Sequence, residues 1–274
     1  MSQPVPPYMQ QPYQPPFAKP TGPQLSPSAG LKYGEMFSHI FQNPDWFTNV
    51  LLCGVCFLIP IVGPIVLLGY RYEVIDHWNR QPGFGYPNFD FGKFGLYLGR
   101  GIWPFLVGMI AGCVTLPLVL VVYVMFVLIV GIAGSIGPDF AFFGVVFGFL
   151  FLMLGIVLSL AVVGIITVPM EIMAGIRKDL GASFDIGFIK DFIRLTWKET
   201  LLGFVFLYIA NMALAIVGML LFCIGIYFTM AIAVMAQTHF EHQLYLLYLS
   251  RGGRPIPGPY NTGGQYPGRA PSGW

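Results

Sequence analysis

Residues 101–130 read GIWPFLVGMIAGCVTLPLVLVVYVMFVLIV and contain no Asp, Glu, Lys or Arg. A helix that crosses the hydrocarbon core of a bilayer needs about 20 consecutive apolar residues, so this stretch predicts a transmembrane helix. Residues 47–69, 140–168 and 201–237 are equally free of charged side chains. As one helix the last stretch would be about 55 Å long, too long for one crossing, and we divide it into a helical hairpin near residues 218–225. The predicted spans are 47–69, 101–130, 140–168, 201–219 and 221–240.

The composition of the whole chain supports this fold class. Of the 274 residues, 56% are hydrophobic and 9% are charged, whereas a typical soluble domain has about 25% charged residues. The apolar stretches are apolar on every side and lack the alternation that marks a membrane barrel. We expect an all-α integral membrane protein with about five transmembrane helices. The net charge of +2 gives no reason to expect nucleic acid as a partner.

Two terminal segments have the composition of disordered chain. Residues 1–32 are rich in Pro, Gln and Tyr, and residues 251–274 are rich in Gly and Pro. Neither carries enough apolar side chains to form a core. Each tail is open to two interpretations, a solvated segment or a docking peptide for a protein partner. The helical membrane domain is predicted to cover residues 33–250.

The positive charges predict the orientation, because short loops rich in Lys and Arg stay on the cytoplasmic side. The basic residues that lie between the apolar stretches are Arg71, Arg80, Lys93 and Arg100 in one loop and Arg177, Lys178, Lys190, Arg194 and Lys198 in another. The turns at residues 131–139 and 218–225 contain none. We expect both basic loops and the C-terminal tail inside the cell and the two uncharged turns outside.

The stretch 47–69 permits two arrangements because it contains Pro60 and Pro64. A single kinked crossing places the N-terminal tail outside. A re-entrant hairpin keeps both ends inside, although each arm would be about 20 Å long, short of the roughly 30 Å core. We favour the single crossing as the simpler geometry.

A short motif recurs within the chain. Asn88-Phe-Asp-Phe-Gly92 is followed, one basic loop later, by Ser183-Phe-Asp-Ile-Gly187, and each copy leads into a membrane stretch. Asp90 and Asp185 stand where an N-cap accepts backbone N–H groups. After the second copy, charged and apolar residues separate at helical spacing, which predicts an amphipathic helix in the headgroup region. Its charged side holds Lys190, Asp191, Arg194 and Lys198, and its apolar side holds Ile186, Ile189, Ile193 and Trp197.

A looser third copy of this unit precedes the first apolar stretch. Met36, Phe37, Ile40 and Phe41 form its apolar face. If all three copies share one design, the first excursion returns to the inner side, which is the best argument for the re-entrant alternative.

The segment NPDWFTNVLLCGVCFLIPIVGPIVLLGYRYEVI, residues 43–75, together with the motif at Asn88, resembles a prokaryotic membrane family known as domain of unknown function 4013. The stretch from Glu171 through Asp185 to CIGIYFTMAIAVMAQ resembles the second half of that family. The resemblance covers roughly residues 33–250. It implies a multi-pass protein of a prokaryotic cytoplasmic membrane, and it brings no activity, cofactor or site residues with it.

Few residues have a pattern that suggests chemistry. Cys53 and Cys56 form a CxxC motif, but their apolar neighbours favour packing over redox or metal chemistry. His239 and His242 have the spacing of two metal ligands on a helix, without an evident third ligand, and fit an interfacial belt with Tyr245 and Tyr248 better.

The remaining candidates are polar residues at the ends or in the middle of apolar stretches. Glu73 and Glu171 are expected near the inner interface in ion pairs with Arg71, Arg177 or Lys178, and Asp139 in the outer turn. Asn49 and Asn211 are expected to form hydrogen bonds between helices rather than a solute pathway. We predict no catalytic, cofactor-binding or metal-binding residues.

We therefore expect a non-enzymatic membrane component that contacts anionic lipid headgroups through its basic loops and protein partners through its tails. The alternative is a small-solute transporter or channel subunit, because internal repeats and Gly/Pro-interrupted helices are common there. A lipid enzyme that uses Glu73, Asp90, Glu171 and Asp185 is a third, weaker hypothesis, because no nucleophile or metal set accompanies these carboxylates.

Overall fold

The computed structural model describes residues 30–80, 85–221 and 225–257, and these residues form helices without any strand. The all-α prediction is confirmed for this part of the chain, whereas most of both predicted tails lies outside it. The elements are α1 (Tyr33–Ser38), η2 (Ile40–Gln42), α2 (Trp46–Cys56), α3 (Val62–Arg80), η3 (Phe91–Lys93), α4 (Phe94–Ile136), α5 (Pro138–Arg177), η4 (Gly181–Phe184), α6 (Ile186–Leu220) and α7 (Gly225–Ser250).

Three of the described helices, α4, α5 and α6, are long and apolar enough to cross a membrane. They contain 43, 40 and 35 residues, which at 1.5 Å per residue gives lengths of about 64, 60 and 52 Å. The predicted spans 101–130, 140–168 and 201–219 therefore lie within longer helices. The ends of these helices reach beyond a hydrocarbon core of about 30 Å.

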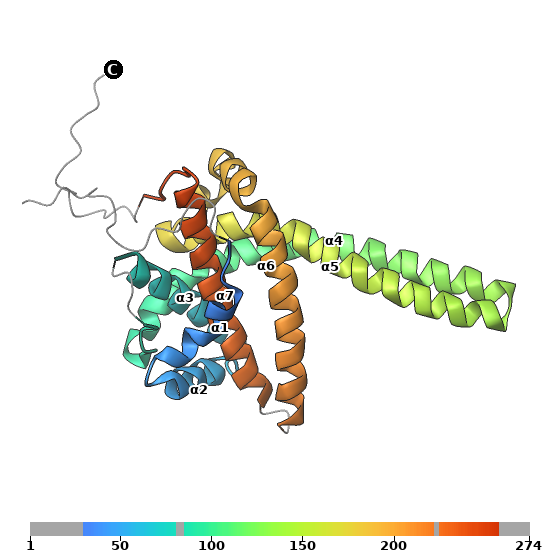
Figure 1. Cartoon of the computed structure of the whole chain (residues 1–274), viewed down its shortest axis with the longest axis horizontal. Coiled ribbons are helices and arrows are strands. Elements are labelled where there is room, and N and C mark those ends of the chain that lie inside the picture. The colour runs from blue at the N-terminus through green and yellow to red at the C-terminus, as the bar shows by residue number, and fades with distance from the viewer. Residues whose placement is uncertain (1–29, 81–84, 222–224, 258–274) are drawn as a thin grey trace, which may run out of the picture.

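Helices α4 and α5 form a long hairpin that extends away from the rest of the molecule (Figure 1). Small residues on α5 allow the close approach: a Cβ at Gly144 would lie 2.3 Å from Ala133 Cβ, and one at Gly155 would lie 2.4 Å from Val122. The outward surface is apolar, with Phe142 69% and Leu116 70% exposed. Water solvates such a surface poorly, whereas acyl chains solvate it well.

The stretch 47–69 is not one helix. Helix α2 ends at Cys56 and α3 begins at Val62, and Ile61 between them has a φ of 64°. Asn49 Oδ1 accepts from Phe89 N at 2.8 Å, and the Tyr70 hydroxyl donates to Pro87 O at 2.6 Å. Because both ends of the stretch contact the same segment, α2 and α3 fold back on one another.

This fold-back differs from the kinked single helix that we favoured. Pro60 lacks the N–H that a continuous helix needs, and the turn at Ile61 reverses the chain. The Lys32 backbone N–H donates to Gln243 Oε1 at 2.8 Å, so the chain before α1 lies beside the last helix. This is the geometry of the re-entrant alternative, and the number of crossings stays a prediction.

Helix α7 lies in the body from which the α4–α5 hairpin extends, and it contacts α1, α2, α3 and α6 (Figure 1). Phe240, Leu244 and Tyr248 on α7 are fully buried. Close packing fixes its neighbours: a Cβ at Gly203 of α6 would lie 2.1 Å from Phe240. Helices α3 and α4 cross through Gly69 and Gly101, where a Cβ would lie 1.8 Å from a backbone oxygen of the other helix.

The recurring motif begins a helical segment in both copies, as predicted. Asp90 Oδ1 accepts from Gly92 N at 2.8 Å before η3 and α4. Asp185 Oδ1 accepts from Phe188 N at 3.1 Å and caps α6. The predicted amphipathic helix after Asp185 is not a separate element, since α6 continues from it to Leu220 without a break.

The start of α2 is tied to the first copy of this motif. Asn43 Nδ2 donates to Asn88 Oδ1 at 2.8 Å, and Asn88 Nδ2 donates to Asp45 Oδ2 at 2.7 Å. Asn43-Pro-Asp45 thus repeats the Asn-x-Asp spacing of the segment that begins at Asn88. The three hairpins α2–α3, α4–α5 and α6–α7 each follow such a motif, with Ser183 in place of Asn in the last.

Candidate functional site

An ion pair joins α3 to α7 in the interior. Arg71 Nη2 donates to Glu241 Oε1, and both residues are almost fully buried. The Tyr72 hydroxyl donates to Glu241 Oε2 at 3.2 Å, and Gln237 Nε2 donates to Oε1 at 3.3 Å. A buried ion pair requires such additional hydrogen bonds to offset the loss of hydration. The carboxylate of Glu241 is therefore held by three donors from two helices.

Glu171 on α5 brings a second carboxyl group to this place. It interacts electrostatically with both Arg71 and Glu241. No residue in the described part of the chain donates a hydrogen bond to its half-buried carboxylate. The cluster of Arg71, Glu171 and Glu241 thus holds two carboxyl groups and one guanidinium, so it contains one positive charge for two acidic groups.

A second buried cation, Arg100 on α4, lies near this cluster. Its Nη1 donates to Glu73 Oε2 at 2.6 Å, and its Nε donates to Gly175 O at 3.0 Å. Asp76 Oδ2 lies 3.4 Å from the same Nη1. The predicted ion pairing of Glu73 is confirmed, but the partner is Arg100 rather than Arg71, Arg177 or Lys178. Within the described residues, Glu171 forms no ion pair at hydrogen-bond distance.

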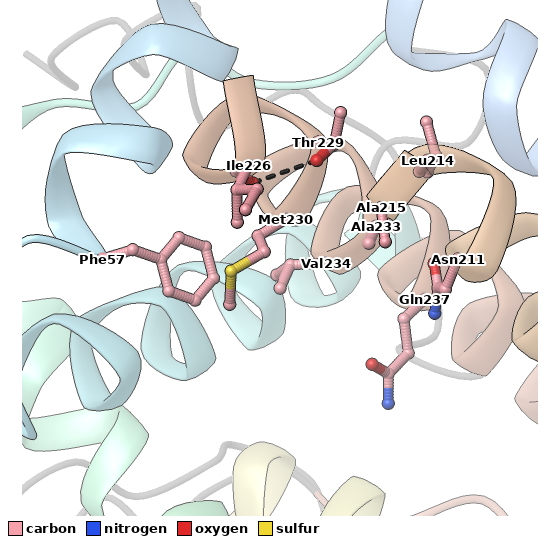
Figure 2. Close-up of a pocket in the computed structure, with 10 residues that line it drawn as sticks. All are labelled: Phe57, Asn211, Leu214, Ala215, Ile226, Thr229, Met230, Ala233, Val234 and Gln237. Carbon is pink, nitrogen blue, oxygen red and sulfur yellow. Dashed lines mark hydrogen bonds between the residues drawn. The ribbon is translucent and has the colours of Figure 1, made fainter. Parts of the chain in front are cut away.

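One cleft near the cluster is largely apolar. It has a volume of about 310 Å³ and lies between the end of α2, α6 and α7 (Figure 2). Phe57, Ile226, Met230 and Val234 form much of its wall, and Asn211 and Gln237 supply amide groups at one end. The expected interhelical hydrogen bond of Asn211 is not present among the described residues, so its amide is left facing this cleft.

A second cleft, the Glu171 cleft, has a volume of about 260 Å³. Helices α4 and α5 provide most of its wall, α6 contributes Phe204, and α7 contributes Gln237. Its other lining residues are Gly108, Ala111, Gly112, Thr115, Leu160, Val163, Gly164, Thr167, Val168 and Glu171. Gln237 lines both clefts and also binds Glu241, so it connects both clefts to the buried ion pair.

The cysteine and histidine motifs have structural surroundings. Cys53 and Cys56 are buried and unpaired, and Cys223 lies outside the described residues. The His239 ring lies 4.8 Å from that of His39, and its Nδ1 is 2.8 Å from Gln243 Nε2. His242 Nε2 is 3.3 Å from Asn79 Oδ1. Within the described ranges, no group of three or more His, Cys, Asp or Glu residues is placed to hold a metal ion.

The first turns of α6 present a basic strip on the surface. Lys190, Arg194 and Lys198 are exposed on one side of this segment, and Lys198 Nζ lies 5.6 Å from the centre of the Trp197 ring. Ile186 and Trp197 are also exposed, whereas Phe188 and Phe192 are buried against the body. The side of α6 that packs against α7 is thus formed by Phe188 and Phe192, which contact Tyr248. The predicted apolar side does not form this contact, since its members Ile186 and Trp197 stay exposed.

The ion pair between Arg71 and Glu241 escaped the sequence analysis. Arg71, Glu171 and Glu241 are each the first charged residue after an apolar stretch, and Arg100 is the last before one. That shared position at the ends of the stretches was the available signal. It did not reveal which residues pair, because 170 residues separate Arg71 from Glu241.

In the residues that the structure describes, these features define an all-helical architecture with three membrane-capable helices and a charged cluster where the hairpins meet. The chain belongs to the family described as Protein of unknown function (DUF4013), whose model matches residues 52–223. No curated protein and no solved structure matches the chain. The expected resemblance to this family is confirmed, and the family description assigns no activity.

Proposed function

We propose that the protein is a non-enzymatic component of the cytoplasmic membrane that gathers anionic lipids at the basic strip of α6. The observation that carries this proposal is the exposed row of Lys190, Arg194 and Lys198 beside exposed Ile186 and Trp197. Cations with neighbouring apolar and aromatic side chains are the combination that binds the headgroup region of an anionic leaflet.

The packing around the strip supports this role. Arg254 Nη2 lies 3.4 Å from Asp191 Oδ2, and Arg251 Nη2 pairs with Glu199 on the same helix. The start of the C-terminal segment therefore adds positive charge beside the strip and satisfies its acidic residues. Asp191 Oδ1 also lies 3.5 Å from Arg194 Nη2. Even so, the basic residues Lys190, Arg194, Lys198, Arg251 and Arg254 outnumber Asp191 and Glu199, and the excess positive charge attracts anionic headgroups at about 1 kcal/mol for each basic residue.

A test uses Trp197 as a reporter in a chain whose other tryptophans are replaced by Phe. In nanodiscs with equal amounts of two lipids, we expect brominated phosphatidylglycerol to quench Trp197 more strongly than brominated phosphatidylcholine. Lys190→Gln, Arg194→Gln and Lys198→Gln together should abolish this preference. The matched control exchanges the same residues but keeps their charge: Lys190→Arg, Arg194→Lys and Lys198→Arg. This control should preserve the stronger quenching by phosphatidylglycerol. Equal quenching by both lipids in the unaltered strip would refute the proposal.

A second candidate function, a small-solute transporter, is favoured by one observation. The two clefts meet at Gln237, and between them they expose the amide of Asn211 and the carboxylate of Glu171. Proteoliposomes that show solute flux lost in both Asn211→Leu and Glu171→Gln would support a pathway through the clefts. Flux that survives both changes would exclude it.

A further inference from the structure

We propose that the Glu171 cleft binds an amphiphile with an ammonium head group, with Glu171 as its counter-ion. This site is separate from the basic strip of α6, which attracts the opposite charge. The inference rests on the shape of the cleft, the charge at one end of it and the hydrogen-bond acceptors that remain free there.

The shape of the cleft is elongated, with one polar end. Its lining on α5 runs from Leu160 to Glu171, a rise of about 16 Å at 1.5 Å per residue. Glu171 and Gln237 lie toward one end, and Leu160 marks the other. Gly108, Ala111 and Gly112 keep the α4 wall low, so that a hydrocarbon chain can lie along it. A cleft that is charged at one end and apolar along its length fits a molecule with a head and a tail.

The charge of the surrounding cluster selects a cation. Arg71 compensates one of the two carboxylates, Glu241, through their direct contact. The carboxylate of Glu171 has no cation at contact distance among the described residues. An ionised carboxylate in a medium of low polarity is costly, and such a group takes up a proton instead unless a cation lies beside it. A ligand that brings one positive charge to Glu171 stabilises the ionised form of this carboxyl group.

The free acceptors match an ammonium group, which has three N–H donors. The Glu171 carboxylate provides two oxygens. Gln237 Nε2 is occupied by Glu241, which leaves Gln237 Oε1 as an acceptor. Thr167 Oγ1 donates to Val163 O at 2.8 Å and keeps its lone pairs. A metal ion fits less well, because no group of three or more metal-ligating side chains gathers in the described residues and most of the wall is apolar.

The position of the cleft explains how such a ligand would enter. The α4–α5 hairpin and the α6–α7 hairpin diverge from a common base (Figure 1), and Gly164 of α5 lies close to the Phe204 ring of α6. The cleft lies at this divergence and is lined by both hairpins. An ammonium group at the end of a hydrocarbon chain can come from the bilayer, as in phosphatidylethanolamine, or from a free alkylamine. Both sources share the recognised chemistry.

The test uses the full chain in phosphatidylcholine nanodiscs at pH 7, where dodecylamine is almost entirely ammonium. We expect dodecylamine to raise Tm, and dodecanol, which has the same tail and a neutral head, to leave it unchanged. In Glu171→Gln the apparent Kd for dodecylamine should rise at least about 10-fold, because a charge-assisted hydrogen bond is lost. An equal rise of Tm in Glu171→Gln, or an equal effect of dodecanol, would overturn the proposal.

A steric variant keeps the test informative if Glu171→Gln fails to fold. A Cβ at Gly112 would meet no atom within 4 Å, and neither would a Cβ at Gly131 farther along α4. Gly112 lines the cleft and Gly131 does not. Gly112→Phe should therefore abolish the effect of dodecylamine, whereas Gly131→Phe should retain it. Retention in both variants would show that the amine binds elsewhere and would refute the proposal.

Two further measurements distinguish the sources. If the bilayer supplies the ligand, phosphatidylethanolamine nanodiscs should raise Tm as dodecylamine does, and lipid extraction should recover phosphatidylethanolamine from the purified protein but less from Gly112→Phe. If the ligand is a free amine, only dodecylamine should act. Both results support ammonium recognition, and the absence of any effect from either source would contradict it.

Discussion

Arg71 and Glu241 form a buried ion pair although 170 residues separate them in the chain. The pair ties the returning arm of the first hairpin to the last helix, and Tyr72 and Gln237 complete its hydrogen bonds. Glu171 brings a third helix to the same place. The charged residues that border the apolar stretches thus converge at the base of the hairpins, where they fix how the hairpins meet.

Removing one partner of this pair should destabilise the protein strongly. Glu241→Gln removes the carboxylate that contacts the buried Arg71 guanidinium and leaves only the more distant Glu171 to compensate it. We expect the free energy of unfolding to fall by up to about 3–5 kcal/mol. The measurement is unfolding in mixed micelles by increasing dodecylsulfate. Glu35→Gln is the matched control, because Glu35 pairs with Lys32 on the exposed surface and its loss should have little effect. Equal effects of both changes would contradict the assignment.

The crossing of α3 and α4 should tolerate no side chain at Gly69. A Cβ there would lie 1.8 Å from Tyr97 O, a backbone atom that cannot rotate away. We expect Gly69→Ala to cost about 1–3 kcal/mol of stability or to prevent folding. Gly99 lies on α4, and a Cβ there would meet nothing within 4 Å. Gly99→Ala should therefore be neutral or stabilising through higher helix propensity. A stable Gly69→Ala variant would show that the helices do not cross here.

Acid should weaken the attachment of the N-terminal helix. Burial lowers the pKa of His39 below its usual value, with a smaller opposing effect from Glu35, and the buried Nδ1 has no partner in the described structure. In the unfolded chain His39 has its ordinary pKa of about 6.5, so the unfolded state binds more protons just below that pH. Stability should therefore fall as the pH drops below about 6.5.

His39→Phe removes this contribution together with the smaller effect of His39 on the neighbouring His239. The difference in free energy of unfolding between the original chain and the variant, measured from pH 8 to pH 5, should change in favour of the variant on acidification. A change in favour of the original chain would mean that folding raises the pKa of His39 instead of lowering it.

The fold-back of α2 and α3 predicts the side of the N-terminal segment. In a chain with its cysteines replaced by Ala, Lys32→Cys and Lys178→Cys should react with an impermeant maleimide only after the membrane is opened. Ser135→Cys, near the turn between α4 and α5, should react in intact cells. Labelling of Lys32→Cys from outside would restore the single crossing of residues 47–69.

Parts of this architecture were accessible from the sequence because they depend on local chemistry. The charge-free stretches mark three of the membrane-capable helices, and the position of Asp90 and Asp185 before such stretches predicts their capping role. The sequence analysis did not predict that α6 is continuous. No Gly or Pro lies between the amphipathic segment and the apolar stretch that follows it, so both can belong to one helix.

The fold-back at Pro60 and the cluster around Glu171 depend on long-range contacts. Pro60 allows either a kink or a reversal, and the contacts of Asn49 and Tyr70 with residues 87–89 decide between them. Likewise, the grouping of Arg71, Glu171 and Glu241 becomes evident only when α3, α5 and α7 are seen to meet. A single sequence contains the residues but not these pairings.

The two contacts at the ends of the described chain have one more consequence. Lys32 binds Gln243, and Ile256 N donates to the Tyr245 hydroxyl at 3.0 Å, so both flanking segments leave from positions two residues apart on α7. A partner that holds one flanking segment meets the other at a high effective concentration. A partner that binds both flanking segments at once would then bind much more tightly than a partner that binds one. Moving apart the points where the two segments leave α7 would remove this gain in affinity without altering either segment.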